Sequence, residues 1–224
     1  MEEILNELEN LLGRCRKTGD RAGEAAALAR IGNALRRKRK WPQAVAALQK
    51  ARDIHTSLGD PAGQATTLAC IGAVYWEQAQ IKKAAAHLGE ALELFPRMTE
   101  KKGQNIVTAL FALSRWRQGD QAEALSLIGD ALPSGTSAAP EPFLPLVEAM
   151  QNAAAQLENR ITREETSGHP QRTLQAHLAL VPLYLCLGNI ESSASHHNQA
   201  KALAQETRDA KAIAILTTLF RLLP

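Results

Sequence analysis

The histidines and cysteines are the side chains of this sequence best suited to bind a metal ion or to attack a substrate. His196 and His197 are adjacent, so on a helix their side chains would point about 100° apart and could not easily share one ion. No cysteine lies near a histidine-plus-acid pattern that would activate a nucleophile. We therefore predict no metal site, no cofactor and no catalytic residue. The remaining histidines are scattered, without a cysteine or carboxylate at ligand spacing: His55, His87, His169 and His177.

The short motifs of phosphate-binding and metal-dependent enzymes are also missing. The sequence contains no G-x-x-x-x-G-K loop, no G-x-G-x-x-G after a strand and no H-E-x-x-H. We therefore expect a binding or structural protein rather than an enzyme.

Binding chemistry is indicated instead by large aromatic and cationic side chains at one regular spacing. Arg36, Trp76 and Trp116 follow one another at intervals of 40 positions. Tryptophan offers a large apolar surface with one hydrogen-bond donor and is enriched at binding hot spots. Arginine can hold a carboxylate through two parallel hydrogen bonds. Equal spacing predicts that the three residues occupy equivalent positions in a repeated structure.

A run of five cations, RRKRK at residues 36–40, has two interpretations. It could contact phosphates or act as a nuclear address. It could equally be a solvated helix end, where cations interact favourably with the helix dipole. The run does not recur in the later copies of the repeat, and the net charge is only +3. These features argue against a continuous track for nucleic acid.

Residues 19–95 contain two copies of one pattern, because residues 19–55 align with residues 59–95. The shared residues recur at helical spacing, and two apolar stripes separated by a turn predict two antiparallel helices per copy. Gly32 and Gly72 would lie mid-helix, where glycine costs about 1 kcal/mol relative to alanine. We therefore expect another helix to pass very close to each of them. The stripes of the first copy are Leu28, Ile31 and Leu35, then Ala44, Leu48 and Ala51.

The composition supports helices and offers no signal for secretion or membrane insertion. The chain of 224 residues is 45% hydrophobic but only 4% aromatic, and alanine and leucine favour helices. No apolar run approaches the roughly 20 residues that span a bilayer, and the start of the chain is acidic and amphipathic. The three cysteines form no C-x-x-C pair, and their odd number fits a reducing compartment. We expect a cytoplasmic location.

The repeated pattern resembles the tetratricopeptide repeat family. Its marks are an apolar-glycine pair, a large or aromatic residue, a Gly-Asp or Gly-Asn turn and small residues in the second helix. The second copy has Leu68, Ile71-Gly72, Tyr75, Ile81, Ala84, Leu88 and Ala91. A third copy has Phe111, Gly119-Asp120, Ala124, Ile128 and Ala131. A late copy has Leu180, Tyr184, Gly188-Asn189, Ala200 and Leu203, but departs from the pattern at Val181 and Ser193.

The resemblance implies an all-α fold, a right-handed α-solenoid of antiparallel helix pairs with capping helices. The period of 40 residues exceeds the usual period of about 34, which implies longer helices. A solenoid repeats its unit because one helix pair cannot bury its apolar face alone. We expect a capping helix at 1–17, three repeat units at 18–132, a linker at 133–142, an irregular long helix at 143–166, a further helix pair at 167–207 and a closing helix at 208–224.

In this family the first helix of each unit faces the concave side, so the resemblance also implies a groove for a partner. The positions that would face it are largely those where the copies differ. They are Asn33, Arg36, Arg37, Thr66, Trp76, Glu77, Leu113, Trp116 and Arg117. The groove would be basic near the first unit and aromatic to apolar near the third. The alternative is that the two tryptophans are covered by the chain itself, with the helix at 143–166 as the obvious self-ligand.

We therefore expect a non-enzymatic scaffold or adaptor that binds a peptide or helix of another protein, with acidic and apolar anchor residues. One alternative is a self-assembling structural module, a homo-oligomer joined through its terminal helices. The last turn of the chain, with Leu219, Phe220, Leu222 and Leu223, would form a dimer contact in such a module, and otherwise packs as a cap on the solenoid. Another alternative is a regulatory module that contacts nucleic acid through residues 36–40.

Overall fold

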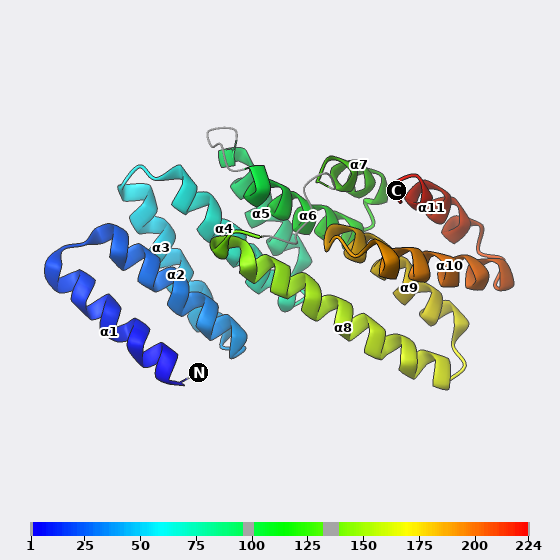
Figure 1. The fold of residues 1–224 in the computed structure, drawn as a ribbon, viewed down its shortest axis with the longest axis horizontal. Coiled ribbons are helices and arrows are strands. Elements are labelled where there is room, and N and C mark those ends of the chain that lie inside the picture. Colours follow the sequence, from blue (N-terminus) through cyan, green and yellow to red (C-terminus); the bar gives the residue numbers. More distant parts are fainter. Residues whose placement is uncertain (1, 96–100, 132–138, 224) are drawn as a thin grey trace.

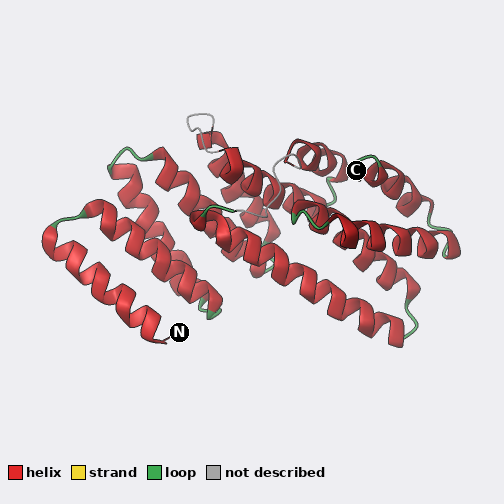
Figure 2. Cartoon of the chain, viewed as in Figure 1, coloured by secondary structure: helices red, strands yellow, loops and turns green. Residues whose placement is uncertain are grey.

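The computed structural model describes residues 2–95, 101–131 and 139–223, and these residues form helices joined by short turns (Figures 1 and 2). No strand occurs among the described residues. The all-α solenoid predicted from the sequence is confirmed. The helices are α1 (Glu2–Thr18), α2 (Arg21–Arg37), α3 (Trp41–Ser57), α4 (Pro61–Glu77), α5 (Ile81–Leu94), α6 (Lys101–Gln118), α7 (Gln121–Ala131), the 3₁₀ turn η3 (Glu141–Phe143), α8 (Leu144–Thr166), α9 (Pro170–Cys186), α10 (Ile190–Glu206) and α11 (Ala210–Phe220).

Consecutive helices pack as pairs: α2 with α3, α4 with α5, α6 with α7, and α9 with α10. A repeated cap starts the first helix of several pairs. The Asp20 carboxylate accepts a hydrogen bond from the Gly23 amide at 2.8 Å, and Asp60 does the same for Gly63 at 2.9 Å. The glycine before each of these caps has a positive φ, which ends the preceding helix. The Gly-Asp signal in the sequence thus stops one helix and starts the next.

Close helix packing occurs at the two mid-helix glycines. A Cβ atom added at Gly32 would lie 2.6 Å from the Cγ atom of Leu48, and one at Gly72 would lie 2.7 Å from the Cγ atom of Leu88. Both leucines are fully buried on the second helix of the same pair. In the α2–α3 and α4–α5 pairs the helices therefore approach through a glycine-leucine contact that a side chain at the glycine would block.

The long helix α8 interrupts the regular stack. It crosses the face formed by the first helices and packs against α4, α6 and α9 (Figure 1). Phe143, Leu146 and Met150 of this segment are buried in the main core. The predicted linker at 133–142 lies mostly outside the described residues.

The two terminal helices each have one packed face. Helix α1 packs against α2 through Leu5 and Leu8, and α11 packs against α10 and α9. Leu219 is fully buried and Leu222 and Leu223 are half-buried against the core, whereas Phe220 is 64% exposed. No helix in the described part of the chain is long and apolar enough to cross a membrane.

Candidate functional site

Three of the predicted groove residues, Arg36 and Arg37 on α2 and Glu77 on α4, form an ion-pair cluster with Glu148 of α8. The guanidinium of Arg36, whose side chain is only 1% exposed, donates to Glu77 at 2.8 Å and to Glu148. Arg37 binds the other oxygen of Glu148 at 2.6 Å, and Asn152 donates to Glu77 at 3.0 Å. Arg36, expected from the sequence to hold a partner's carboxylate, therefore holds two carboxylates of its own chain.

The carboxylate of Glu148 is charged in this cluster. Burial raises the pKa of its carboxyl group, but the hydrogen bonds and charges of Arg37 and Arg36 outweigh burial and hold the pKa below its ordinary value. The cluster joins the first unit, the second unit and α8, so it helps to fix where α8 lies across the first helices of these units.

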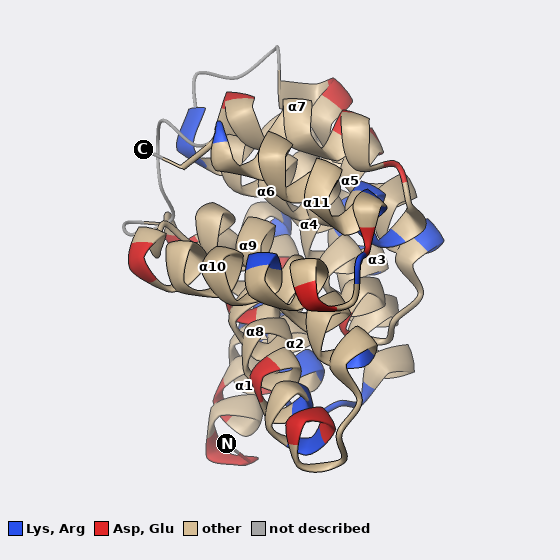
Figure 3. Ribbon diagram, turned by 90° about the vertical axis from the view of Figure 1, so that its right-hand side faces the viewer, with Lys and Arg blue, Asp and Glu red and all other residues tan. Residues whose placement is uncertain are grey.

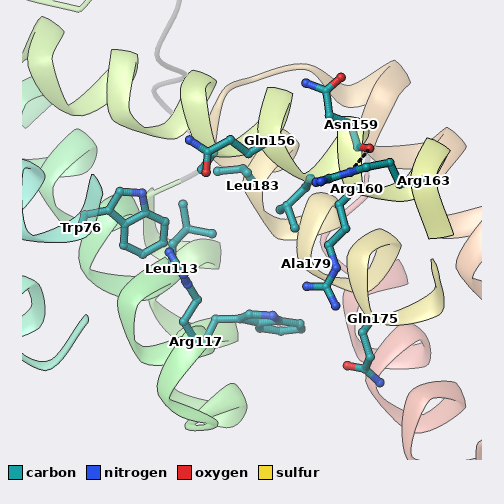
Figure 4. A pocket seen from close by; sticks show the side chains of 13 residues that line it. Trp76, Leu113, Arg117, Gln156, Asn159, Arg160, Arg163, Gln175, Ala179 and Leu183 are labelled. Atoms are coloured by element: carbon teal, nitrogen blue, oxygen red, sulfur yellow. Dashed lines mark hydrogen bonds between the residues drawn. The ribbon is translucent and has the colours of Figure 1, made fainter. Parts of the chain in front are cut away.

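A pocket of about 740 Å³ lies next to this cluster, between α4 and α6 on one side and α8 and α9 on the other (Figure 4). Four predicted groove residues contribute to its wall, and α8 and α9 contribute the rest. It is lined by Trp76, Leu113, Trp116 and Arg117, by Ala153, Gln156, Leu157, Asn159, Arg160 and Arg163 of α8, and by Gln175, Ala179 and Leu183 of α9.

The charge of this pocket is positive. Arg117 lies with its guanidinium 4.8 Å from the centre of the Trp76 ring, and burial lowers the pKa of Arg117. Arg160 and Arg163 stand on the opposite wall (Figure 4), and no residue lining the pocket is acidic. Within the described part of the chain, no carboxylate pairs with Arg117 or Arg163, and Arg160 lies 3.9 Å from Glu164. The pocket therefore offers cationic donors above an aromatic surface.

The two tryptophans belong to the core as well as to the pocket. Trp76 is 4% exposed and Trp116 is 8% exposed. The alternative that the chain covers them thus holds for most of their surface, while one part of each ring borders the pocket. Because each tryptophan is both buried and part of the pocket wall, replacing it would disturb both the fold and the pocket.

Asn33 and Thr66 lie in neither the ion-pair cluster nor the pocket. The Asn33 amide donates to the Cys70 sulfur at 3.8 Å, and the exposed Thr66 hydroxyl donates to the carbonyl of Ala62 on its own helix at 2.8 Å. Of the basic run 36–40, Lys38 lies 3.4 Å from Glu2, so three of its five cations pair with carboxylates of the chain.

The sequence did not indicate the residues of α8 and α9 that line the pocket. Ala153, Leu157 and Arg160 follow at helical spacing along α8, but this helix is outside the repeat register, so no equivalent position pointed to them. The feature that could have indicated this wall is the pair Arg160 and Arg163, which lie one turn apart on the helix expected to cover the groove.

The structure brings together two histidines that are 19 positions apart in the sequence. His177 and His196 approach with their Nδ1 atoms 2.9 Å apart, and His196 stacks on Tyr184, whose hydroxyl donates to Glu158 of α8. Burial, with a smaller effect of His196, lowers the pKa of His177 to about 4. Within the described residues, no group of three side chains could hold a metal ion.

This histidine pair predicts a pH dependence of stability. A histidine whose pKa is lower when folded destabilises the protein as the pH falls from about 6.5, its unfolded value, towards about 4. Glu24 and Glu148, whose pKa values are also lowered, act in the same direction. We expect His177→Gln to weaken the loss of stability between pH 7 and pH 4.5, measured by denaturant unfolding, whereas His169→Gln, at a half-exposed histidine, leaves it unchanged. If both variants lose the same free energy of unfolding between pH 7 and pH 4.5, protonation of His177 does not destabilise the fold.

The cysteines lack the surroundings of a reactive thiol. Cys15, Cys70 and Cys186 are free and buried. Burial raises the pKa of Cys70 to about 11 and that of Cys186 to about 12. Both thiols are therefore protonated and weakly nucleophilic at neutral pH.

Comparisons with known proteins agree with this architecture. Residues 23–97 match the tetratricopeptide repeat family. Among solved structures, the one described as "Crystal structure of BtubC (BKLC) from P. vanneervenii" matches with a TM-score of 0.53 and 12% sequence identity. The match covers 93% of this chain and 92% of that chain, and at this identity it concerns the fold alone. A comparison with curated proteins gave no match.

Proposed function

Residues 23–97 match the tetratricopeptide repeat family, and from that premise we propose that the protein is a scaffold or adaptor that binds an acidic segment of a partner protein in the pocket between α4, α6, α8 and α9. Tetratricopeptide repeats generally mediate contacts between proteins. The observation that carries the proposal is the pocket itself, which combines two tryptophans and three arginines with no acidic side chain.

Charge supports an acidic ligand. Arg117 is exposed, lies over the Trp76 ring and has no carboxylate partner among the described residues, so its guanidinium is free to bind an incoming acid. An incoming carboxylate would pair with it and would meet Arg160 and Arg163 on the opposite wall. Arginine suits this role because its planar group can hold a carboxylate through two hydrogen bonds.

Shape supports an apolar anchor beside the acidic residue. The edges of Trp76 and Trp116, together with Leu157 and Leu183, form an apolar surface next to the arginines. Pockets of a few hundred cubic ångströms with such a mixture are typical of ligand sites. A partner segment with a large apolar side chain between acidic residues would satisfy both surfaces.

The basic run favours a protein partner over nucleic acid. Arg36 is buried, and Arg37 and Lys38 pair with Glu148 and Glu2. A phosphate track needs several free cations in a row, and this run offers few.

We predict that synthetic peptides with leucine or phenylalanine between glutamates bind the protein, measured by fluorescence anisotropy. Replacing both pocket arginines, as in Arg160→Gln with Arg163→Gln, should weaken this binding about tenfold or more. The reason is that a hydrogen bond to a charged group contributes about 1.5–3 kcal/mol. Both arginines are exposed, so the melting temperature should change little.

The matched control is Arg30→Gln with Lys50→Gln, which removes two exposed cations outside the pocket. It should leave peptide affinity nearly unchanged. Ala179→Trp, at the α9 wall, should block the apolar part of the pocket and also abolish binding. Peptides with glutamine in place of glutamate should bind more weakly. Equal binding of acidic and neutral peptides, or equal losses in the pocket and control variants, would refute the proposal.

A further inference from the structure

The first pocket, which Trp76 and Arg117 border, adjoins a second pocket of about 680 Å³. The second pocket is lined by the residues of the ion-pair cluster together with Arg39, Trp41 and Gln156. Gln156 of α8 lines both pockets, and on α4 the first pocket ends at Trp76 where the second begins at the next residue. The two pockets therefore adjoin on both walls and form one groove.

Helix α8 runs along this groove and passes the ends of α2, α4 and α6 in turn. Glu148 binds Arg37 at the end of α2, and Asn152 binds Glu77 at the end of α4. Further along α8, the first pocket begins, with Arg117 at the end of α6. The groove thus follows one helix past three successive repeat units.

The length of the groove can be measured along α8. Its lining residues on this helix extend from position 148 to position 163, which is about 22 Å at a rise of 1.5 Å per residue. An extended peptide covers this length with about seven residues, at about 3.3 Å per residue. One short segment of a partner is therefore long enough to reach both pockets.

The second pocket contains one arginine that is free to bind a ligand. Its other two arginines are held by the carboxylates of the ion-pair cluster, whereas the exposed Arg39 has no carboxylate partner in the described part of the chain. The Arg39 amide donates to the carbonyl of Arg36 at 2.8 Å, so the turn after α2 fixes the position of this residue. Trp41 is half-buried and presents the rest of its surface to the same pocket.

Each pocket therefore offers an unpaired arginine together with a tryptophan surface, which are Arg117 with Trp76 in the first and Arg39 with Trp41 in the second. Helix α8 carries charges of both signs (Figure 3), but its one acid in this groove, Glu148, is already bound in the ion-pair cluster. Three arginines line each pocket, against two glutamates in the second pocket and none in the first. The excess of positive charge along the whole groove favours an acidic segment.

We infer that the second pocket is a further binding subsite, and that the partner is an extended acidic segment that lies along α8 with one acidic anchor in each pocket. The inference rests on the proposed function, which places the first anchor beside Arg117. A second acid of the segment binds Arg39, and an apolar neighbour of that acid contacts Trp41. The exposed amide of Gln156 lies between the anchors, where it pairs with the main chain of the segment.

The amide side chains between the anchors favour an extended segment over a helix. The main-chain groups of a helix bind one another, so they leave nothing for Gln156 to pair with, whereas an extended chain exposes these groups. Joining two anchors in one segment makes the second contact intramolecular, so the affinity of the whole segment exceeds that of either anchor alone.

The test compares two labelled peptides of equal length by fluorescence anisotropy with the full chain. The first has Glu-Leu-Glu at both ends of a serine-proline spacer, with the cluster centres about seven residues apart. Identical clusters make the direction of the peptide irrelevant, and proline prevents a helix. The second peptide has Gln-Leu-Gln in place of one cluster. The two-cluster peptide should bind about tenfold tighter or more.

Protein variants locate the second anchor. Arg39→Gln should lower the affinity for the two-cluster peptide to about that for the one-cluster peptide, and should leave the one-cluster peptide unaffected. The matched control is Lys40→Gln, which removes the next cation of the same turn. Lys40 is exposed and lines neither pocket, so both affinities should stay the same. Arg160→Gln with Arg163→Gln should weaken both peptides, because it acts on the first pocket.

The outcomes separate this inference from the proposed function. If the one-cluster peptide binds and depends on Arg160 and Arg163, but the two-cluster peptide binds no tighter, the second subsite is wrong and the proposed function stands. A loss in Arg39→Gln no larger than in Lys40→Gln also overturns the second subsite. If neither peptide binds, the proposed function fails and this inference fails with it.

Discussion

Arg36→Met is expected to lower the free energy of unfolding by about 3–5 kcal/mol, the usual cost of removing one partner from a buried ion pair. Arg36 is the largest fully buried polar side chain, and it binds Glu77 and Glu148 from two other helices. Without it, the Glu77 carboxylate, whose side chain is 10% exposed, would remain in the interior without a counter-charge. Denaturant unfolding at neutral pH measures the loss.

Two further variants separate burial from charge. Arg37→Met removes the neighbouring arginine from the same Glu148, but this side chain is 50% exposed, so the cost should stay below about 1 kcal/mol. Arg36→Met with Glu77→Gln removes the buried charge left behind and should recover part of the stability. If Arg36→Met costs no more than Arg37→Met, the cluster does not hold α8 against the first two units.

The regular part of the fold could be predicted from the sequence because its signals are local. A positive-φ glycine followed by a capping aspartate, as at Gly19 and Asp20, occupies two adjacent positions and recurs with the repeat. The close helix contact at Gly72 likewise follows from glycine's cost inside a helix and the matching leucine of the next helix. Because the same local pattern recurs in successive copies, each copy supports the same assignment of helices and turns.

The candidate site could be predicted only on one side, because its other side is nonlocal. Arg36 meets Glu148 across 112 positions of sequence, and α8 has no repeat copy to supply a register. The sequence therefore gave no reason to place Arg160 opposite Arg117. It did indicate that the segment at 143–166 was irregular and suited to cover the groove, and α8 lies there.

The tryptophans show a different limit. A large apolar residue at a repeated concave position is favoured equally by core packing and by ligand contact, because both bury apolar surface. Sequence spacing alone could not choose between them. The structure places Trp76 and Trp116 in the core with one edge on a pocket, so the arginines around them are the better probes of binding.

Gly72→Leu is expected to destabilise the solenoid by about 1–3 kcal/mol or more through overpacking. A Cβ atom there would lie 2.7 Å from Leu88 Cγ and 3.0 Å from its Cδ2, and the leucine is fully buried between helices with no room to move. Gly32→Leu should behave in the same way against Leu48, because the contact recurs one unit earlier. Thermal and denaturant unfolding measure both losses.

Gly13→Ala is the matched control, because Gly13 also lies inside a helix, α1, but has nothing within 4 Å of an added Cβ atom. This substitution should leave stability unchanged or raise it by up to about 1 kcal/mol, since alanine favours a helix more than glycine does. The opposite signs at Gly72 and Gly13 would show that space between the helices, and not helix propensity, determines where the repeat needs glycine. Near-neutral results for both Gly32→Leu and Gly72→Leu would contradict the repeat register on which the pairing of α2 with α3 and of α4 with α5 depends.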